Sequence, residues 1–233
     1  MGDEERRLEL IRRIASVVGH ELRNPLAVIS NSAYFIQARL GQEGALDPKV
    51  SRHLEIVASE IARADRMIAE ILAYSRPLQL KRARLDLAAL VKEQLRSAAI
   101  PAPIKVQAKL EAVSIDGDGE ALGDAVRRLL DNAVEAMPSE GTLSASVYES
   151  KGFAVIEVRD GGPGVNPELA SVLFEPFRTD KPRGLGLGLA LARKAVEAHG
   201  GRAEGGSADG GGALFRLLLP AGAAGRATSA RGR

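Results

Sequence analysis

Four short stretches of the sequence hold residues that could carry out chemistry. His20 and Glu21 are adjacent in VVGHELRNPLAVI, and Asn132 lies in RRLLDNAVEAM. Two glycine-rich stretches follow, DGGPG from Asp160 and GLGLGLA from Gly184. A neutral imidazole nitrogen is a competent nucleophile near its ordinary pKa of about 6.5, and a neighbouring carboxylate can orient the ring or accept the displaced proton. His20 and Glu21 are therefore candidates for a nucleophile and its base.

The other three stretches suit the binding of a charged or planar ligand. The side-chain oxygen of Asn132 could serve Mg²⁺, which prefers a few protein oxygens together with phosphates and water. Asp160 could accept a hydrogen bond from an exocyclic amine, and the glycines after it allow a close approach of the backbone. Repeated glycines before a helix leave N–H groups that attract an anion. Taken singly, Asn132 also fits a helix cap or a surface amide, and DGGPG also fits a plain turn.

Two common nucleotide motifs do not describe the second glycine stretch. A dinucleotide-binding fingerprint would place a third glycine after Gly186 and Gly188, but Leu191 stands there and no strand directly precedes the motif. A Walker A loop is excluded because no Gly-Lys-Ser/Thr follows. Three basic residues between the glycine stretches could close over phosphates as a mobile lid: Arg178, Lys181 and Arg183.

Composition excludes several classes of protein. The 233 residues include no cysteine and three histidines, which excludes disulfide scaffolds, cysteine-ligated zinc and histidine-rich metal sites. The chain is nearly balanced, with 32 basic and 30 acidic residues, and aromatic residues make up 3%, so no nucleic-acid partner is expected. Apolar stretches fall far short of the ~20 residues of a membrane span. We therefore expect no membrane segment in this chain and a cytoplasmic location.

The elements that must position these residues change in character near residue 77. Apolar residues recur at steps of three and four over Leu8–Leu40 and Val50–Ile71, which predicts two long helices. Gly41–Asp47 predicts the turn between them, and Pro25 is expected to bend the first helix. Two helices with narrow seams leave an apolar face partly open, so we expect a homodimeric four-helix bundle. A partner face in the second half of the chain is the alternative.

The rest of the chain predicts an α+β sandwich of mixed strand order and a short tail. Helices are expected over Asp86–Ala99, Glu120–Met137 and Leu185–His199. Strands are expected over Ile104–Leu110, Thr142–Tyr148, Phe153–Arg159 and Ala213–Leu219, the first of them half-buried. Residues 221–233 are small, basic and rich in glycine and alanine, which predicts a disordered tail.

The order of the motifs resembles the transmitter core of the sensor histidine kinases of two-component signalling. In the terms of that family, the H box is HELRNP from His20, the N box centres on Asn132, and the G1 box is DGGPG from Asp160. The F box is FEPF from Phe174, and the G2 box is GLGLG from Gly184. The form NAVEAM and the short lid are most similar to the nitrogen-regulation-like branch.

The resemblance implies a fold and an activity. Residues 1–77 would be an all-α dimerisation and phosphoacceptor domain, and residues 78–220 an ATP-binding α+β sandwich of the Bergerat (GHKL) type. The protein would be an ATP-dependent protein-histidine kinase that phosphorylates itself on His20 and passes the phosphoryl group to an aspartate of a response regulator receiver domain. Glu21 would act as base, and Asn24 would position water for dephosphorylating the regulator. The chain would be cytoplasmic, alone or as the cytosolic part of a longer sensor.

ATP and Mg²⁺ are the cofactors that the resemblance implies. Asn132 would hold the metal, Asp160 would bind adenine, and Lys181 would meet phosphate. The full set of implied nucleotide-binding residues is Asn132, Glu135, Asp160, Gly162, Gly164, Lys181, Gly184, Gly186 and Gly188.

The sequence departs from the family pattern at three positions. Arg128 stands where a second asparagine often precedes the metal-binding one, Asp180 follows Thr179 in place of paired threonines, and Leu rather than Thr follows Gly184. None of these changes removes an essential group, so an active kinase is expected.

Three other classes of protein remain as alternatives. The glycine stretches argue against a phosphotransfer protein that does not bind ATP. An outward His-Glu pair has no purpose in a Bergerat ATPase of the chaperone, topoisomerase or mismatch-repair kind. A coiled-coil adaptor leaves the second half of the chain unexplained.

Overall fold

The computed structural model describes residues 23, 25–38, 40, 47–137, 139–181 and 184–221. The chain divides into two compact units, Met1–Pro77 and Leu78–Arg233. Within the described ranges, no helix is both long and apolar enough to cross a membrane. Apart from Ala221, the predicted tail lies outside the described residues.

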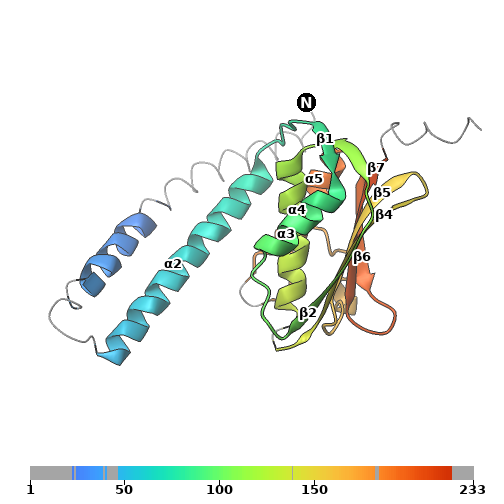
Figure 1. Cartoon of the computed structure of the whole chain (residues 1–233). Helices are drawn as coiled ribbons and strands as arrows, with labels where there is room; N and C mark the ends of the chain where they lie inside the picture. The colour runs from blue at the N-terminus through green and yellow to red at the C-terminus, as the bar shows by residue number, and fades with distance from the viewer. Residues whose placement is uncertain are drawn as a thin grey trace, which may run out of the picture. The chain divides into compact units, whose positions relative to one another are not determined.

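The long helix of the first unit is α2, Pro48–Ser75 (Figure 1). The carboxylate of Asp47 caps its start by accepting the Lys49 N–H at 2.7 Å, and Pro48 fits the first turn because no helical partner is needed there. The predicted helix start at Asp47 is therefore confirmed. Residues 25–38 are also helical, Pro25 included, whereas residues 41–46 of the predicted turn lie outside the described residues.

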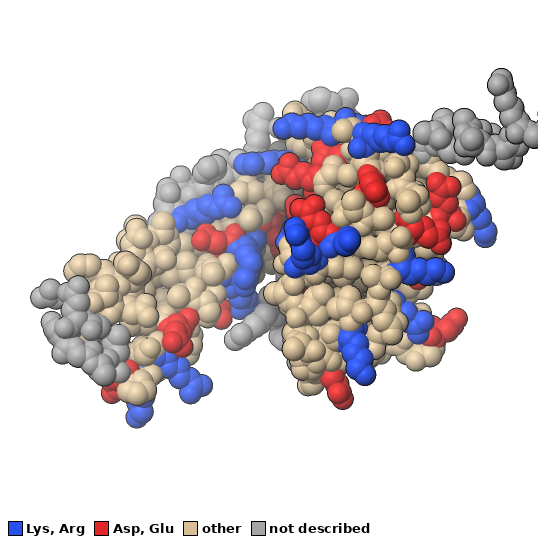
Figure 2. Space-filling view, viewed as in Figure 1, with Lys and Arg blue, Asp and Glu red and all other residues tan. Residues whose placement is uncertain are grey.

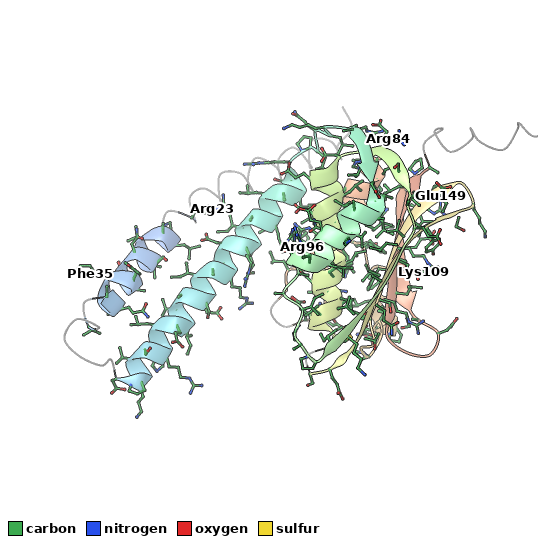
Figure 3. The ribbon with its side chains drawn as sticks, in the orientation of Figure 1. Arg23, Phe35, Arg84, Arg96, Lys109 and Glu149 are labelled. Carbon is green, nitrogen blue, oxygen red and sulfur yellow. The ribbon has the colours of Figure 1, made fainter. Side chains whose placement is uncertain are left out.

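Both helical stretches of this unit expose large apolar side chains. On α2, Ile61, Ile68 and Leu72 are buried. Tyr34 and Phe35 are 73% and 69% exposed, and Figure 3 labels Phe35 on the shorter stretch. The other exposed large apolar residues of the unit are Val28, Ile29, Ile36, Leu40, Val50, Ile56 and Val57. Exposed apolar surface of this extent is typical of an interaction surface.

The second unit is a two-layer sandwich of a mixed sheet and three helices (Figure 1). The strands of the sheet are β2 (Ile104–Leu110), β4 (Gly141–Ser150), β5 (Phe153–Arg159), β6 (Arg202–Ser207) and β7 (Ala213–Pro220). Their order is β2-β4-β5-β7-β6, with β2 and β4 parallel and the other neighbours antiparallel. The helices α3 (Leu87–Ser97), α4 (Gly119–Glu135) and α5 (Gly188–Ala198) pack on one face. The predicted α+β sandwich is confirmed.

Two smaller elements complete this unit. The strands β1 (Ala83–Asp86) and β3 (Ser114–Gly117) pair antiparallel in a separate sheet. A single 3₁₀ turn, Pro167–Leu169, follows the first glycine-rich loop. Lys and Arg are interspersed with Asp and Glu over the visible face of the unit (Figure 2).

Alternation along β4 separates the two faces of the sheet. Leu143, Ala145 and Val147 are buried beneath the helices, and the intervening serines point to the opposite face. The helix α4 contributes four large side chains with 0% exposure to this core: Leu122, Val126, Leu129 and Leu130. Because burying each such side chain contributes about 1.5–3 kcal/mol, α4 is fixed firmly against the sheet.

Some predicted elements differ from the structure. The sequence pattern does not predict β1, β3 or β6, which are short and lack a clear apolar alternation, so their partner strands determine them. The prediction of a half-buried β2 is wrong: Ile104 is buried, but Val106 is 46% exposed because β2 lies at the edge of the sheet. The helix α5 begins at Gly188 rather than at Leu185.

The ring of His199 joins the end of α5 to the start of α4. It is buried, its Nε2 accepts the N–H of Asp118 at 2.9 Å, and its Nδ1 lies 2.7 Å from the carbonyl oxygen of Ala195. Because an amide donates and a carbonyl accepts, the ring is held as the Nδ1–H tautomer. His199 is therefore a structural residue.

The carboxylate of Asp118 caps α4 and fixes the chain that enters the unit. It accepts hydrogen bonds from the N–H groups of Glu120 and Ala121 at 3.0 Å each and from that of Lys81 at 2.6 Å. Hydrogen bonds from Ala121, Lys81 and Glu120 lower the pKa of Asp118, although desolvation opposes them. The ionised carboxylate thus stabilises the folded unit.

We predict that Asp118→Ala lowers the free energy of unfolding at pH 7 by about 1–2 kcal/mol, as for a lost helix cap. Because the pKa is lowered on folding from its ordinary value of 3.8, the charge-dependent part of this stability is present above that pH. It is lost as the pH falls through the pKa of the folded state. Urea unfolding at several pH values measures the effect, with Asp124→Ala on the exposed side of α4 as control. A difference that stays constant down to pH values below 3.8 would contradict this role.

Candidate functional site

Asp160, at the end of β5, is the most constrained polar side chain of the candidate site. It is 2% exposed, and its Oδ1 accepts the N–H groups of Gly162 at 2.9 Å and Ala213 at 3.1 Å. Its Oδ2 is buried and has no hydrogen-bond partner among the described residues. An unpaired buried acceptor of this kind costs about 1–3 kcal/mol, and more when charged. The carboxylate is therefore ready to accept a hydrogen bond from a ligand.

The loop after Asp160 lies against the end of α4. The N–H of Gly161 is 3.3 Å from Sδ of Met137, and a Cβ on Gly162 would lie 2.8 Å from the carbonyl oxygen of Ala136. A side chain at Gly162 would therefore push the loop away from α4. Gly164 has a φ of 87° and faces the hairpin between β6 and β7. The loop thus needs Gly162 for close approach and Gly164 for its turn.

The hairpin between β6 and β7 also belongs to the site, which the sequence interpretation missed. Gly212 has a φ of 80°, and a Cβ there would lie 1.8 Å from the carbonyl oxygen of Asp160. The Oγ of Ser207 accepts the N–H of Val165 at 3.1 Å. The run of three glycines, Gly210–Gly212, directly before the last strand is the sequence signal that could have revealed this contact.

Lys181 joins two of the predicted site residues on α4. Its Nζ donates to Oδ1 of Asn132 at 2.6 Å and to Oε2 of Glu135 at 2.7 Å. Asn132 and Glu135 are three residues apart and so share one side of the helix. The structure therefore brings Asn132, Glu135 and Lys181 together.

The neighbouring carboxyl group of Asp131 has a raised pKa. Burial is the largest cause, Glu135 adds to the increase, and Arg127 and Arg128 oppose it.

A backbone hydrogen bond joins the two sides of the segment that carries Lys181. The N–H of Phe177 donates to the carbonyl oxygen of Gly186 at 3.1 Å, and a Cβ on Gly186 would lie 2.5 Å from the carbonyl oxygen of Arg178. The Phe174 ring packs edge-on against that of Phe215, with centroids 6.3 Å apart, and so ties the segment to the core. The predicted lid residue Arg183 lies outside the described residues.

The second glycine stretch begins α5. Gly184 donates its N–H to the carbonyl oxygen of Lys181 at 3.3 Å, and Gly188 is the first residue of the helix. Among the described residues no side chain caps this helix start, and the position of a Cβ on Gly188 is open. The first N–H groups of α5 are therefore suited to an anion, as the sequence predicts.

A hollow of about 370 Å³ borders the candidate site, because Asp160, Gly161, Gly162 and Gly210–Gly212 belong to its lining. Its other lining residues include Thr142, Ser144 and Arg159, and the last two are paired across β4 and β5. These positions alternate with the buried Leu143 and Val158, so the hollow opens away from the helices. Asn132 and Lys181 do not line it.

The predicted residues of the first unit cannot be placed. His20, Glu21 and Asn24 lie outside the described residues. Their roles therefore remain predictions from the sequence.

Comparison with protein families identifies both halves of the chain. Residues 10–79 match the His Kinase A (phospho-acceptor) domain. Residues 117–223 match the histidine kinase-, DNA gyrase B- and HSP90-like ATPase family. The chain belongs to the sensor histidine kinases and contains their transmitter core.

Similar proteins of known name support this assignment. The histidine-protein kinase AtoS of Escherichia coli is 31% identical over 97% of this chain and 38% of its own length. The sensor histidine kinase ZraS of Klebsiella oxytoca is 33% identical over 92% of this chain and 47% of its own length. This chain therefore spans less than half of either relative.

Solved structures share the fold. A mycobacterial sensor histidine kinase, MprB, is 29% identical over 60% of this chain and 97% of its own chain, with a TM-score of 0.55. The histidine kinase ThkA, solved in complex with the response regulator protein TrrA, covers 94% of this chain and 64% of its own chain with a TM-score of 0.65 at 24% identity.

Proposed function

We propose that this chain is an ATP-dependent protein-histidine kinase that phosphorylates His20 and transfers the phosphoryl group to an aspartate of a response regulator. The observation that carries the proposal is the presence of a phosphoacceptor domain and an ATPase domain, in that order, in one chain. An ATPase of the chaperone kind has no use for the first domain, and an adaptor has no use for the second. The ThkA complex supports a regulator as partner by analogy.

Asp160 is the proposed adenine-binding residue. Its unpaired Oδ2 needs a donor, which the exocyclic amine of adenine supplies. The uncapped N–H groups at the start of α5 suit the phosphates, and Lys181 adds a positive charge. Gly162, Gly164, Gly184, Gly186 and Gly188 shape the two loops around this ligand.

Asn132 is the proposed protein ligand for Mg²⁺. Its Oδ1 already accepts a hydrogen bond from a cationic group, the ammonium of Lys181, so the donor type and its surroundings suit a metal ion. When bound, Mg²⁺ would neutralise negative charge on the phosphate oxygens.

The proposed reaction has two phosphoryl transfers. An unprotonated imidazole nitrogen of His20 attacks the γ-phosphorus of ATP; an N–P bond forms, and the bond to the bridging oxygen breaks. ADP leaves with that electron pair, and Glu21 accepts the imidazole proton. In the second transfer Glu21 returns the proton to the ring, a carboxylate oxygen of the regulator attacks the same phosphorus, and the N–P bond breaks with its electron pair on the nitrogen, which restores neutral His20.

A homodimer is the proposed assembly, with residues 1–77 as the dimerisation domain and 78–220 as the ATP-binding domain. Exposed apolar residues such as Ile29, Ile36 and Val57 lie at seam positions of the predicted helices. A second copy of the helical hairpin would bury them in a four-helix bundle.

We predict that His20→Gln abolishes autophosphorylation while ADP affinity stays near that of the wild type, because the nucleotide site lies in the other unit. Radiolabelled ATP should give acid-labile, base-stable label on the wild type, and His53→Gln on α2 is the matched control. Label that persists in the His20 variant, or free phosphate without protein label, would refute the assignment.

We predict that Asp160→Asn weakens ADP binding by roughly 5–150-fold, the equivalent of about 1–3 kcal/mol. The amide oxygen would keep the two contacts of Oδ1, so the NH₂ group would replace Oδ2 and present a donor to the adenine amine. Calorimetry measures the affinity, with Asp116→Asn on the exposed side of β3 as control. Melting temperatures should not fall, because the variant removes an unpaired buried charge. Unchanged ADP affinity would exclude this role.

We predict that Asn24→Ala keeps autophosphorylation and phosphotransfer but loses most dephosphorylation of the regulator. His20 and Asn24 are four residues apart in the sequence, so on a helix they share one face. An uncharged amide can hold a water near an aspartyl phosphate without acting as a strong base. The three activities and the melting temperature should be measured on one preparation. An equal loss of all three with a lower melting temperature would instead indicate a structural role.

A further inference from the structure

The ammonium group of Lys181 lies between a side-chain oxygen of Asn132 and one of Glu135. The ammonium of Lys181 lies 2.6 Å from Oδ1 of Asn132 and 2.7 Å from Oε2 of Glu135. Both oxygens come from one side of α4, whose inner face is fixed in the core. Amide and carboxylate oxygens are also the ligands that Mg²⁺ prefers. The place that Nζ occupies is therefore also suited to a divalent metal ion.

The sequence gives a reason to look for a second metal ligand beside Asn132. Arg128 stands one turn earlier, where the resemblance leads to a second asparagine. Arginine donates hydrogen bonds and has no free acceptor, so it cannot bind a metal ion. Glu135 lies one turn later and shares with Asn132 the contact to one ammonium group. Its carboxylate can supply the missing oxygen.

We propose that Glu135 is a second protein ligand for the divalent cation of the nucleotide site, and that Lys181 occupies this position until the cation arrives. This inference rests on the proposed ATP site. A metal ion with ligands at about 2.0–2.1 Å cannot share these oxygens with an ammonium group, because the space is the same and the charges repel. Lys181 is then released toward the phosphates.

The local structure permits this exchange. The Lys181–Glu135 pair is partly exposed, with 38% and 64% of the two side chains accessible, and exposed pairs of this type are weak. The backbone of Lys181 is held separately, since its N–H donates to Oγ1 of Thr179 and its carbonyl oxygen accepts the N–H of Gly184. A change of side-chain rotamer is therefore enough, and no helix or strand has to move.

Titration of the whole nucleotide-free chain with Mn²⁺ tests the exchange. Electron paramagnetic resonance measures free Mn²⁺, and line broadening of the Asn132 side-chain amide signal locates the bound ion. We expect Lys181→Met to bind Mn²⁺ about two- to fivefold more tightly than the wild type, because a competing, partly exposed ion pair is lost. Lys92→Met, on the exposed side of α3, is the matched control and should behave as the wild type.

The double variant Lys181→Met, Glu135→Gln separates ligation by Glu135 from the mere loss of a positive charge. We expect it to lose the gain and the broadening at Asn132. The inference is overturned if Lys181→Met binds no more tightly than Lys92→Met, or if the double variant binds as tightly as Lys181→Met. Neither measurement involves phosphoryl transfer, so a failure here is distinct from the failure of the His20 assignment.

Discussion

A carboxylate that is buried but only half hydrogen-bonded follows β5, the middle strand of the sheet. One oxygen of Asp160 joins the end of β5 to the start of β7 and to the first glycine-rich loop. Those contacts orient the side chain so that the other oxygen stays unpaired. The cost of that unpaired oxygen is tolerable because the surrounding sheet and helices bury a large apolar core. A ligand that donates a hydrogen bond to this oxygen removes the unfavourable free energy, so the site prefers ligands with a donor at that position.

The helix α4 links that core to the charged part of the site. Its inner face is fixed by Leu129 and Leu130, while Asn132 and Glu135 lie on a more exposed side. A rigid helix holds the two oxygens at a fixed spacing, which a metal ion requires more strictly than a flexible ammonium does. The segment carrying Lys181 is instead attached through the Phe177–Gly186 hydrogen bond, the Phe174–Phe215 ring contact and the side chain of Lys181. The metal-binding oxygens of Asn132 and Glu135 thus lie on a rigid helix, while the ammonium group that contacts them lies on a more loosely attached segment.

Periodicity in the sequence predicted the larger elements and failed at the small ones. The seam over Val50–Ile71 gave α2, and the alternation over Thr142–Tyr148 gave β4, because each pattern repeats often enough to define a face. The strands β1 and β3 have four residues each, too few for a period to appear. For β2 the alternation was present, but its edge position left Val106 exposed. Position in a sheet is a property of neighbours, which no local pattern contains.

For the site, residue types and their order determined the chemistry, since an imidazole, an amide oxygen, a carboxylate and glycine-rich loops each permit few reactions. The sequence by itself therefore determined the family and the candidate residues. Only the tertiary structure decided which of them meet. The contacts of Lys181 with Asn132 and of Ala213 with Asp160 join residues 49 and 53 positions apart. The contact of Gly212 with Asp160 likewise depends on how β7 pairs with β5. Such contacts arise when apolar faces pack and bring distant segments together, and hydrogen-bond geometry then selects among the side chains within reach.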